Sequence, residues 1–410
     1  MWLLSVFLLF QATPAQPRVS TCVQCHQELD SSPQSPVELV KQDVHFQKGL
    51  SCHSCHGGDP TRGMDSGEPK DSMDPAKGYI GVPSRPKIAA LCASCHSKLD
   101  FMRHFNPQAR VDQYAEYRTS VHGKKNQAGD LNVATCIDCH GAHGVKAVSD
   151  PTGPVYPTNV TSTCARCHSD AKKMSGYKIP TNQMALYEKS VHGEALIKNR
   201  DISAPTCNDC HGNHGAVPPG VDSVANVCGQ CHVSQWELFD KSPHKAPFAE
   251  SQFLACATCH EHHSVQRTSD DMLGVEESAT CVSCHEKGSA GYLAGAEMKR
   301  GIIGLRDHLE SAHQVLARAE RAGMEVSRAS FELAEGRDRL VRARVEIHRF
   351  DKAELQKLVD EGMKIAASSQ EGGRKALSEL VYRRKGLAVS VVILLCMMAL
   401  LIVKIRQIER

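Results

Sequence analysis

The chain is 410 residues long and carries 48 lysines and arginines against 46 aspartates and glutamates, which gives a formal net charge of +2. Its 19 cysteines and 22 histidines stand out, whereas aromatic residues make up only 5%. Residues 22–285 contain few long apolar runs, too little for an ordinary hydrophobic core over that length. This composition excludes a conventional globular domain there and requires other apolar bulk in the interior.

Residues 1–15 have the character of an export signal. An apolar stretch over 2–10 is followed by small residues at Ala12 and Ala15, which fits a signal peptide cleaved near Ala15, although no basic residue precedes it. The alternative is an uncleaved anchor, but nine or ten apolar residues are too few to cross a bilayer. We therefore predict that the chain is exported.

Residues 16–289 carry nine copies of Cys-x-x-Cys-His, numbered here as motifs 1 to 9 in chain order. Their cysteines are Cys22 and Cys25, Cys52 and Cys55, Cys92 and Cys95, Cys136 and Cys139, Cys164 and Cys167, Cys207 and Cys210, Cys228 and Cys231, Cys256 and Cys259, and Cys281 and Cys284. Their histidines are His26, His56, His96, His140, His168, His211, His232, His260 and His285.

This pattern is the attachment signature of a c-type haem, in which the cysteines form thioethers and the histidine binds iron. Zinc sites would not keep one spacing nine times, and disulfides would not need the histidine. We predict nine covalently bound c-type haems, whose porphyrins supply the missing apolar bulk. Two propionates on each haem would make the loaded protein acidic, so nucleic acid is excluded as a partner.

Four haem-pair repeats emerge when the chain is aligned on its histidines, near 45–96, 114–168, 187–232 and 239–285. Each has a histidine element, such as Ser-Val-His-Gly, ahead of two motifs, and motif 1 stands outside the scheme.

Seven further histidines occupy fixed places in these repeats. His143, His214 and His263 each lie three residues beyond a motif histidine, on the same side of that haem, so we expect them to bind the iron of a neighbouring haem. Those placed ahead of a haem pair are expected to fold over and bind an iron; they are His45, His122, His192 and His244. The alternative is that they are surface histidines.

Two irons remain without an assigned sixth ligand. The position three residues past His56 is Asp59, so one haem of the first repeat lacks its cross-ligand. The candidates are His104, Met102, His308, His313 and His348, or an open position. His53 and His262 are expected to be bystanders.

Residues 290–385 lack cysteine and place apolar residues at helical spacing. The pattern predicts a long antiparallel helical hairpin, with a phase slip after Gly336 and a turn at Phe350 and Asp351, where Asp351 would cap the second helix. The hairpin would serve as a scaffold or a homodimer interface. His348, near its tip, is a candidate haem ligand.

Residues 386–403 form an uncharged run of 18 residues flanked by basic residues, which predicts a transmembrane tail anchor. Haem attachment outside the cytoplasm then places the haem domain on the periplasmic face of the inner membrane and residues 404–410 in the cytoplasm. Cys396 is expected to be an apolar filler within the span.

The Ser-Val-His-Gly and Cys-His-Gly-x-His-Gly signatures resemble those of the multihaem cytochrome c superfamily, of class III and doubled-CxxCH type, over residues 22–285. The C-terminal part is similar to that of membrane-anchored multihaem cytochromes of respiratory chains. The expected fold is mainly helical with much irregular structure: a haem domain, the hairpin and one C-terminal transmembrane helix.

Electron carriage is the favoured function, because histidine on both faces of an iron closes it to substrates. The chain would carry electrons between a membrane quinol-oxidising subunit and a periplasmic or outer redox partner. The alternative is a multihaem reductase of the nitrite, hydroxylamine or sulfur-oxyanion type with one open haem. A structural or haem-storage role is the third reading.

Overall fold

The computed structural model describes residues 20–62, 69–216 and 223–409, so the expected signal peptide lies outside the described residues. All regular structure in the described residues is helical, which confirms the mainly helical fold class. The chain divides into two compact units, residues 1–224 with 263–265, and residues 225–262 with 266–410.

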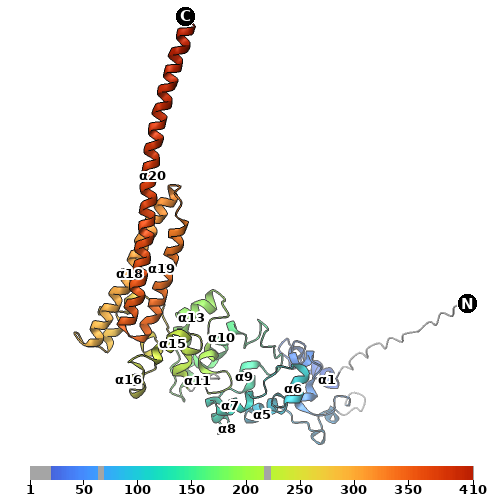
Figure 1. Cartoon of the computed structure of the whole chain (residues 1–410). Helices are drawn as coiled ribbons and strands as arrows, with labels where there is room; N and C mark the ends of the chain where they lie inside the picture. Colours follow the sequence, from blue (N-terminus) through green and yellow to red (C-terminus); the bar gives the residue numbers. More distant parts are fainter. Residues whose placement is uncertain (1–19, 63–68, 217–222, 410) are drawn as a thin grey trace, which may run out of the picture. The chain divides into compact units, whose positions relative to one another are not determined.

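The first unit consists of short helices joined by irregular segments that follow one another in chain order (Figure 1). They are α1 (Thr21–Leu29), α2 (Pro36–Val40), α3 (Val44–Gln47), α4 (Cys52–His56), η1 (Pro69–Asp71), η2 (Pro75–Lys77), α5 (Arg85–His96), α6 (Leu99–Phe105), α7 (Gln113–Thr119), α8 (Val121–Gln127), α9 (Cys136–His140), α10 (Pro157–His168), α11 (Ala171–Met174), α12 (Gln183–Glu188), α13 (Val191–Gly193), η3 (Glu194–Lys198) and α14 (Cys207–His211).

The second unit starts with short helices and ends in three long ones. The first short helices are η4 (Val224–Gln230), α15 (Val233–Asp240), α16 (Lys245–Glu250), α17 (Cys256–His260), η5 (Asp270–Met272) and η6 (Thr280–Ser283), and a further one, η7 (Ile347–Arg349), lies between the last two long helices. The long helices are α18 (Ala290–Arg321), α19 (Ser327–Glu346) and α20 (Lys352–Ile408), which lie side by side (Figure 1).

The apolar cores of the two units differ. The contiguous cluster of buried apolar side chains lies wholly in the second unit, mostly on α18, α19 and α20. Buried apolar residues of the first unit, such as Ile88, Val160 and Leu196, are scattered. Porphyrin therefore remains the natural source of apolar bulk in the first unit.

The expected two-helix hairpin is wrong in one respect, because three helices form a bundle. The expected first limb is divided at 322–326, where Gly323 has a φ of +80°, a conformation that ends helices. The second turn lies where it was expected: Phe350 has a φ of 54°, and the Asp351 carboxylate accepts hydrogen bonds from the backbone N–H groups of Ala353 and Glu354.

The helix directions follow from contacts at small residues. Gly301 and Gly362 place α18 against α20, because their Cβ positions lie 3.4 Å from Val359 and 2.8 Å from Leu305. Since residue numbers rise together along these contacts, α18 and α20 run parallel, and the connecting α19 runs antiparallel to both. The end of the bundle where α19 stops and α20 begins, here called its foot, also contacts a short helix. There the Arg344 guanidinium donates two hydrogen bonds of 2.9 and 2.8 Å to Asp270 of η5.

We expect Leu305→Ala to destabilise the bundle by about 2–5 kcal/mol, because Leu305 of α18 is fully buried against Gly362 of α20 and the loss of its side chain leaves a cavity. Leu293 on the same helix is 53% exposed, so Leu293→Ala should stay within roughly 0.5 kcal/mol of the parent. Denaturant unfolding followed by helical circular dichroism measures both. Equal losses in the two variants would contradict this packing.

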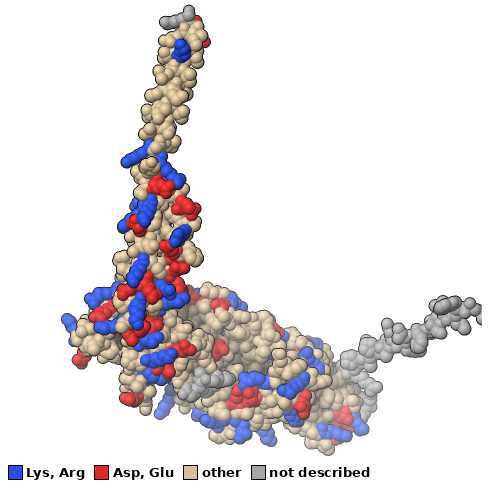
Figure 2. Space-filling model, viewed as in Figure 1, with Lys and Arg blue, Asp and Glu red and all other residues tan. Residues whose placement is uncertain are grey.

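The last part of α20 is apolar and exposed. This helix is long and apolar enough to cross a membrane, with a mean hydropathy of 3.0 in its most apolar window. Figure 2 shows an uncharged stretch between two groups of basic side chains near its end. The helix is continuous from the bundle through this stretch.

Candidate haem-ligation site

Four of the motifs form one helical turn of their own, as α4, α9, α14 and α17. In a helix, residues three apart lie on the same face. The two cysteines of such a motif therefore project together, and the histidine follows at the end of the turn. This local geometry is what two thioether bonds to one porphyrin require.

A side chain fixes the start of several of these turns. Asp138 accepts hydrogen bonds from the backbone N–H and hydroxyl of Thr135 at 2.7 and 2.9 Å and pairs with Arg85 at 2.7 Å. Burial raises the pKa of Asp138, but the hydrogen bonds from Arg85 and Thr135 outweigh burial and leave that pKa lowered. Asp209 accepts from the Thr206 N–H in the same way, at 2.7 Å.

The histidine elements ahead of the pairs are built alike. In α8, the Ser120 hydroxyl accepts from the Gly123 N–H at 3.0 Å and donates to the Tyr117 carbonyl at 2.7 Å. The Tyr117 hydroxyl donates to Ala134, just before motif 4, at 2.9 Å. Ser190, Gly193 and Tyr187 repeat these contacts around α13. The sequence reasoning missed these supports, although the repeated Tyr-x-x-Ser-Val-His-Gly pattern was a signal for them.

We expect Gly123→Ala to displace α8 and remove His122 from its site. A Cβ at Gly123 would lie 1.9 Å from the Tyr117 carbonyl oxygen, so the helix must move. One haem should then become high-spin, as seen by visible absorption and electron paramagnetic resonance. Gly176→Ala is the control, because nothing lies within 4 Å of its Cβ position. An unchanged spectrum for Gly123→Ala would contradict the expected role of this glycine.

Seven motif histidines each face one histidine from elsewhere in the chain. In the first unit the ring centroids are 5.8 Å apart for His45 and His96, 6.1 Å for His56 and His143, 6.1 Å for His122 and His168, 6.2 Å for His140 and His214, and 5.9 Å for His211 and His263. In the second unit they are 5.9 Å apart for His244 and His285 and 6.1 Å for His260 and His348.

These distances fit an iron between each pair of rings. Two imidazoles that bind one metal from opposite faces, with bonds of about 2 Å, place their centroids about 6 Å apart. The residues present thus fit haem iron: the motif cysteines would hold the porphyrin and the paired histidines would bind its iron. When bound, haem supplies one-electron redox chemistry.

The pairing follows one rule along the chain. Motifs 2, 4 and 6 face a histidine from the next repeat, and motif 8 faces His348, which takes the place of the histidine of a further repeat. Their ring planes are within 4–27° of parallel. Motifs 3, 5 and 9 face the histidine ahead of their own pair, with ring planes at 56–84°. There are therefore two kinds of site.

Hydrogen bonds orient several of the rings. The Nδ1 atoms of His45, His56 and His348 lie 2.9 Å from the Asp43 carboxylate and from the carbonyls of Gly81 and Val345. An Nδ1–H that donates there leaves Nε2 free to bind a metal. Burial lowers the pKa of most paired rings, which keeps them neutral as ligands; these are His96, His122, His140, His143, His168, His214, His244 and His260.

The other candidates lie elsewhere. His104 is exposed on α6 with its ring edge against Phe105 at 5.1 Å, and Met102 is half-buried on the same helix. On α18, His308 bonds the carbonyl of Gly304 at 2.8 Å and His313 is exposed. None of these four side chains meets a motif histidine in the described residues. His192 lies on α13, and His232 precedes α15.

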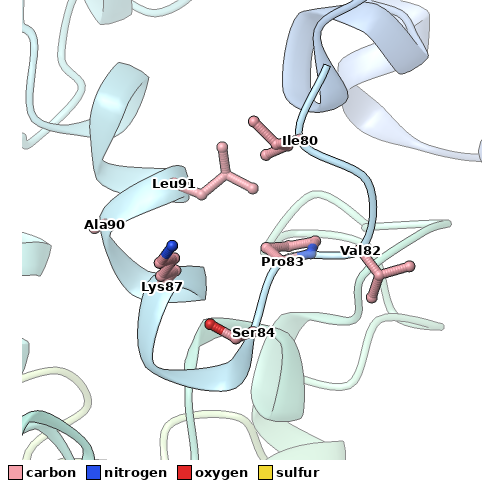
Figure 3. A pocket seen from close by; sticks show the side chains of 7 residues that line it. All are labelled: Ile80, Val82, Pro83, Ser84, Lys87, Ala90 and Leu91. Atoms are coloured by element: carbon pink, nitrogen blue, oxygen red, sulfur yellow. The ribbon is translucent and has the colours of Figure 1, made fainter. Parts of the chain in front are cut away.

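An apolar hollow of about 500 Å³ lies between the segment after motif 2 and α5 (Figure 3). It is lined by Ile80, Val82, Pro83, Ser84, Lys87, Ala90 and Leu91. Leu91 directly precedes Cys92, and Gly81 holds the ring of His56. The apolar lining suits a porphyrin face, and the Lys87 ammonium would suit a propionate.

Cysteines of successive motifs lie close together. Burial and the neighbouring thiols raise the pKa of Cys52 beside Cys22 and of Cys55 beside Cys92, and a hydrogen bond from Cys92 lowers the pKa of Cys136. The same closeness continues over motifs 4 to 6, between Cys139 and Cys167 and between Cys164 and Cys207. In the second unit it links motifs 7 to 9, between Cys228 and Cys256 and between Cys259 and Cys281. Within each unit, motif neighbours in sequence are neighbours in space.

Repeated haem-attachment motifs, seven of which face a second histidine, define a multihaem c-type cytochrome, and the comparisons with known proteins agree. Residues 154–233 match the family model described as cytochrome c7 and related cytochrome c, and residues 245–290 match the doubled CXXCH motif.

Among individual relatives, the chain is 24% identical over 211 residues to the multiheme cytochrome MtrA of Shewanella baltica, covering 49% of this chain and 53% of that protein. It is 24% identical over 336 residues to the C-type polyheme cytochrome OmcC of Geobacter sulfurreducens, covering 72% and 40%. The match to OmcB of that species is 26% over 210 residues, covering 47% and 24%. The chain thus spans about half or less of these relatives. No solved structure gave a significant match.

Proposed function

We propose that this protein is a membrane-tethered electron carrier with nine covalently bound haems. The observation that carries the proposal is the set of seven imidazole pairs at 5.8–6.2 Å. An iron with histidine on both faces keeps nearly the same geometry in both redox states and offers no site to a substrate, which suits electron transfer.

Electrons would move from haem to haem in chain order within each unit. The closeness of cysteines from successive motifs supports this path, because each porphyrin is bonded to them. The pairing rule supports it too, since every histidine that serves the neighbouring repeat ties two porphyrins to one short stretch of backbone. Such links keep the distances between haems short and constant.

The tail of α20 would anchor the protein in the inner membrane, with the haem domain on the periplasmic face after export. The anchor is far from the haems of the second unit. His348 precedes the first residue of α20, and the apolar run starts at Gly386. At 1.5 Å per residue this part of the helix is about 50 Å long. A quinol-oxidising membrane partner would therefore need a domain that projects about this far to reach motif 8.

The proposal is tested with the purified, haem-loaded protein. Once reduced by dithionite, it should be re-oxidised rapidly by a soluble ferric c-type cytochrome, while nitrite, hydroxylamine and tetrathionate should not be consumed through repeated turnovers. Sustained consumption of any of these compounds would replace the carrier by a reductase. Failure to exchange electrons with the soluble cytochrome would also overturn the proposal.

A further inference from the structure

Motif 1 differs from the seven paired motifs. Its histidine, His26, is exposed on α1 and faces no histidine ring within the described residues. All 22 histidines of the sequence lie in the described ranges. The first-unit histidines that are neither the closing histidine of a motif nor at a repeat position are His53, inside motif 2, and His104. His53 bonds Ser51 at 2.6 Å, and His104 lies against Phe105.

The pairing rule explains this difference. In each pair, the histidine of the first motif is followed by Gly or Glu and, three residues after it, by a further histidine or Asp59. Motif 1 lacks this continuation and so resembles the second motif of a pair. Second motifs 3, 5 and 9 face a histidine that lies ahead of their pair. Residues 1–21 contain no histidine. Within residues 1–410, the rule therefore supplies no second imidazole to His26.

Asp59 fits the same rule. In the later repeats, the residue three past the first motif histidine is a histidine that faces the first motif of the preceding pair. The first repeat has Asp59 at this position, so it supplies no imidazole to a preceding motif. The carboxylate there bonds locally instead, to the backbone and hydroxyl of Thr61 at 3.0 and 2.6 Å.

We propose that the haem on Cys22, Cys25 and His26 has an exchangeable sixth position that binds small neutral ligands of the carbon monoxide and nitric oxide class. This rests on the part of the proposed function that attaches a haem to motif 1. Thr21, which directly precedes Cys22, donates hydrogen bonds of 3.1 and 2.9 Å to the carbonyl of Pro60, four residues past His56, so this haem would lie next to motif 2. The open iron would be in redox contact with the others.

The test is a carbon monoxide titration of the dithionite-reduced protein, together with its haem count by mass spectrometry. Ferrous iron bound by two histidines resists carbon monoxide. The pairing rule assigns His192, ahead of its pair, to motif 7, which leaves motif 1 as the one open iron, so we expect one molecule per chain. The variant Cys22→Ala with Cys25→Ala should lose one haem and all carbon monoxide binding. The control, Cys281→Ala with Cys284→Ala, should also lose one haem but keep the single binding site.

Absence of binding in a parent protein that holds nine haems would overturn the inference and leave the carrier proposal intact. Retained binding in the Cys22 and Cys25 variant would do the same, since the ligand would then sit on another iron. A parent with fewer haems would instead contradict the haem count on which both proposals depend. Because the parent titration alone decides the first outcome, the inference stays testable if a variant fails to mature.

Discussion

Replacing His348 by alanine is expected to convert one haem from low to high spin and to add one carbon monoxide binding site to the reduced protein. The reason is the ring contact that His348 makes with motif 8: its ring lies 6.1 Å from that of His260, with 27° between the planes. Its Nδ1 is 2.9 Å from the Val345 carbonyl, which leaves Nε2 toward the iron. No other histidine faces His260 in the described residues.

The low-spin signal that disappears identifies the haem. Ring planes near parallel and ring planes near perpendicular split the iron d orbitals differently, so electron paramagnetic resonance should separate the two kinds of site. His348 belongs to the near-parallel kind, and its loss should reduce that group.

His308→Ala is the matched control. His308 also bonds a backbone carbonyl of its own helix through Nδ1, at 2.8 Å, but faces no motif histidine in the described residues. Its replacement should leave every haem signal unchanged. If His348→Ala behaved like His308→Ala, the bundle would have no part in haem ligation.

Ligation by His348 also gives the bundle a structural role. Each repeat relies on the next one for a histidine, so the last repeat needs a substitute, as terminal units of repeat proteins need caps. His348 sits on η7, where α19 ends, and Phe350 two residues later packs against His244 with ring centroids 4.1 Å apart. The foot of the bundle thereby closes the array.

The features that sequence reasoning predicted are those fixed by short-range geometry. One helical turn sets the spacing of Cys136 and His140, and three residues keep His143 on the same side, so that it must serve another haem. Which haem it serves depends on packing between distant segments: His143 meets His56, two motifs earlier. Nothing in the sequence around His143 specifies which earlier motif it meets.

In the bundle, the sequence pattern hid one helix boundary. Met324 and Val326 continue the apolar spacing of α18, so the break at Gly323 was hidden, although both side chains are buried in the core of the bundle. The phase slip after Gly336 indicates, from the sequence alone, only an irregularity within one helix. In the structure, Gly336 lies inside α19, where its Cβ position is 2.7 Å from Leu309 and 3.2 Å from Ile365. It marks a close helix contact.

Two arginines in the apolar run should release the protein from the membrane. The double variant Leu394→Arg with Met398→Arg places two charges near the centre of the span, each costing about 2.5–3.5 kcal/mol for insertion. Together they disfavour insertion by roughly 5–7 kcal/mol, more than a thousandfold in the insertion equilibrium. Fractionation of cells into membrane and soluble parts, followed by haem staining, gives the measurement.

The matched variant Leu394→Ala with Met398→Ala keeps the run uncharged and should stay in the membrane fraction. Both side chains are more than half exposed, and the buried part of α20 ends near Ala376. Neither pair of changes should therefore disturb the bundle or the haem spectrum. If the arginine variant remained in the membrane after a high-salt wash, another part of the protein or a bound partner would hold it there. If it left the membrane with an unaltered spectrum, anchoring by the end of α20 and haem ligation by His348 of η7 would be separate functions.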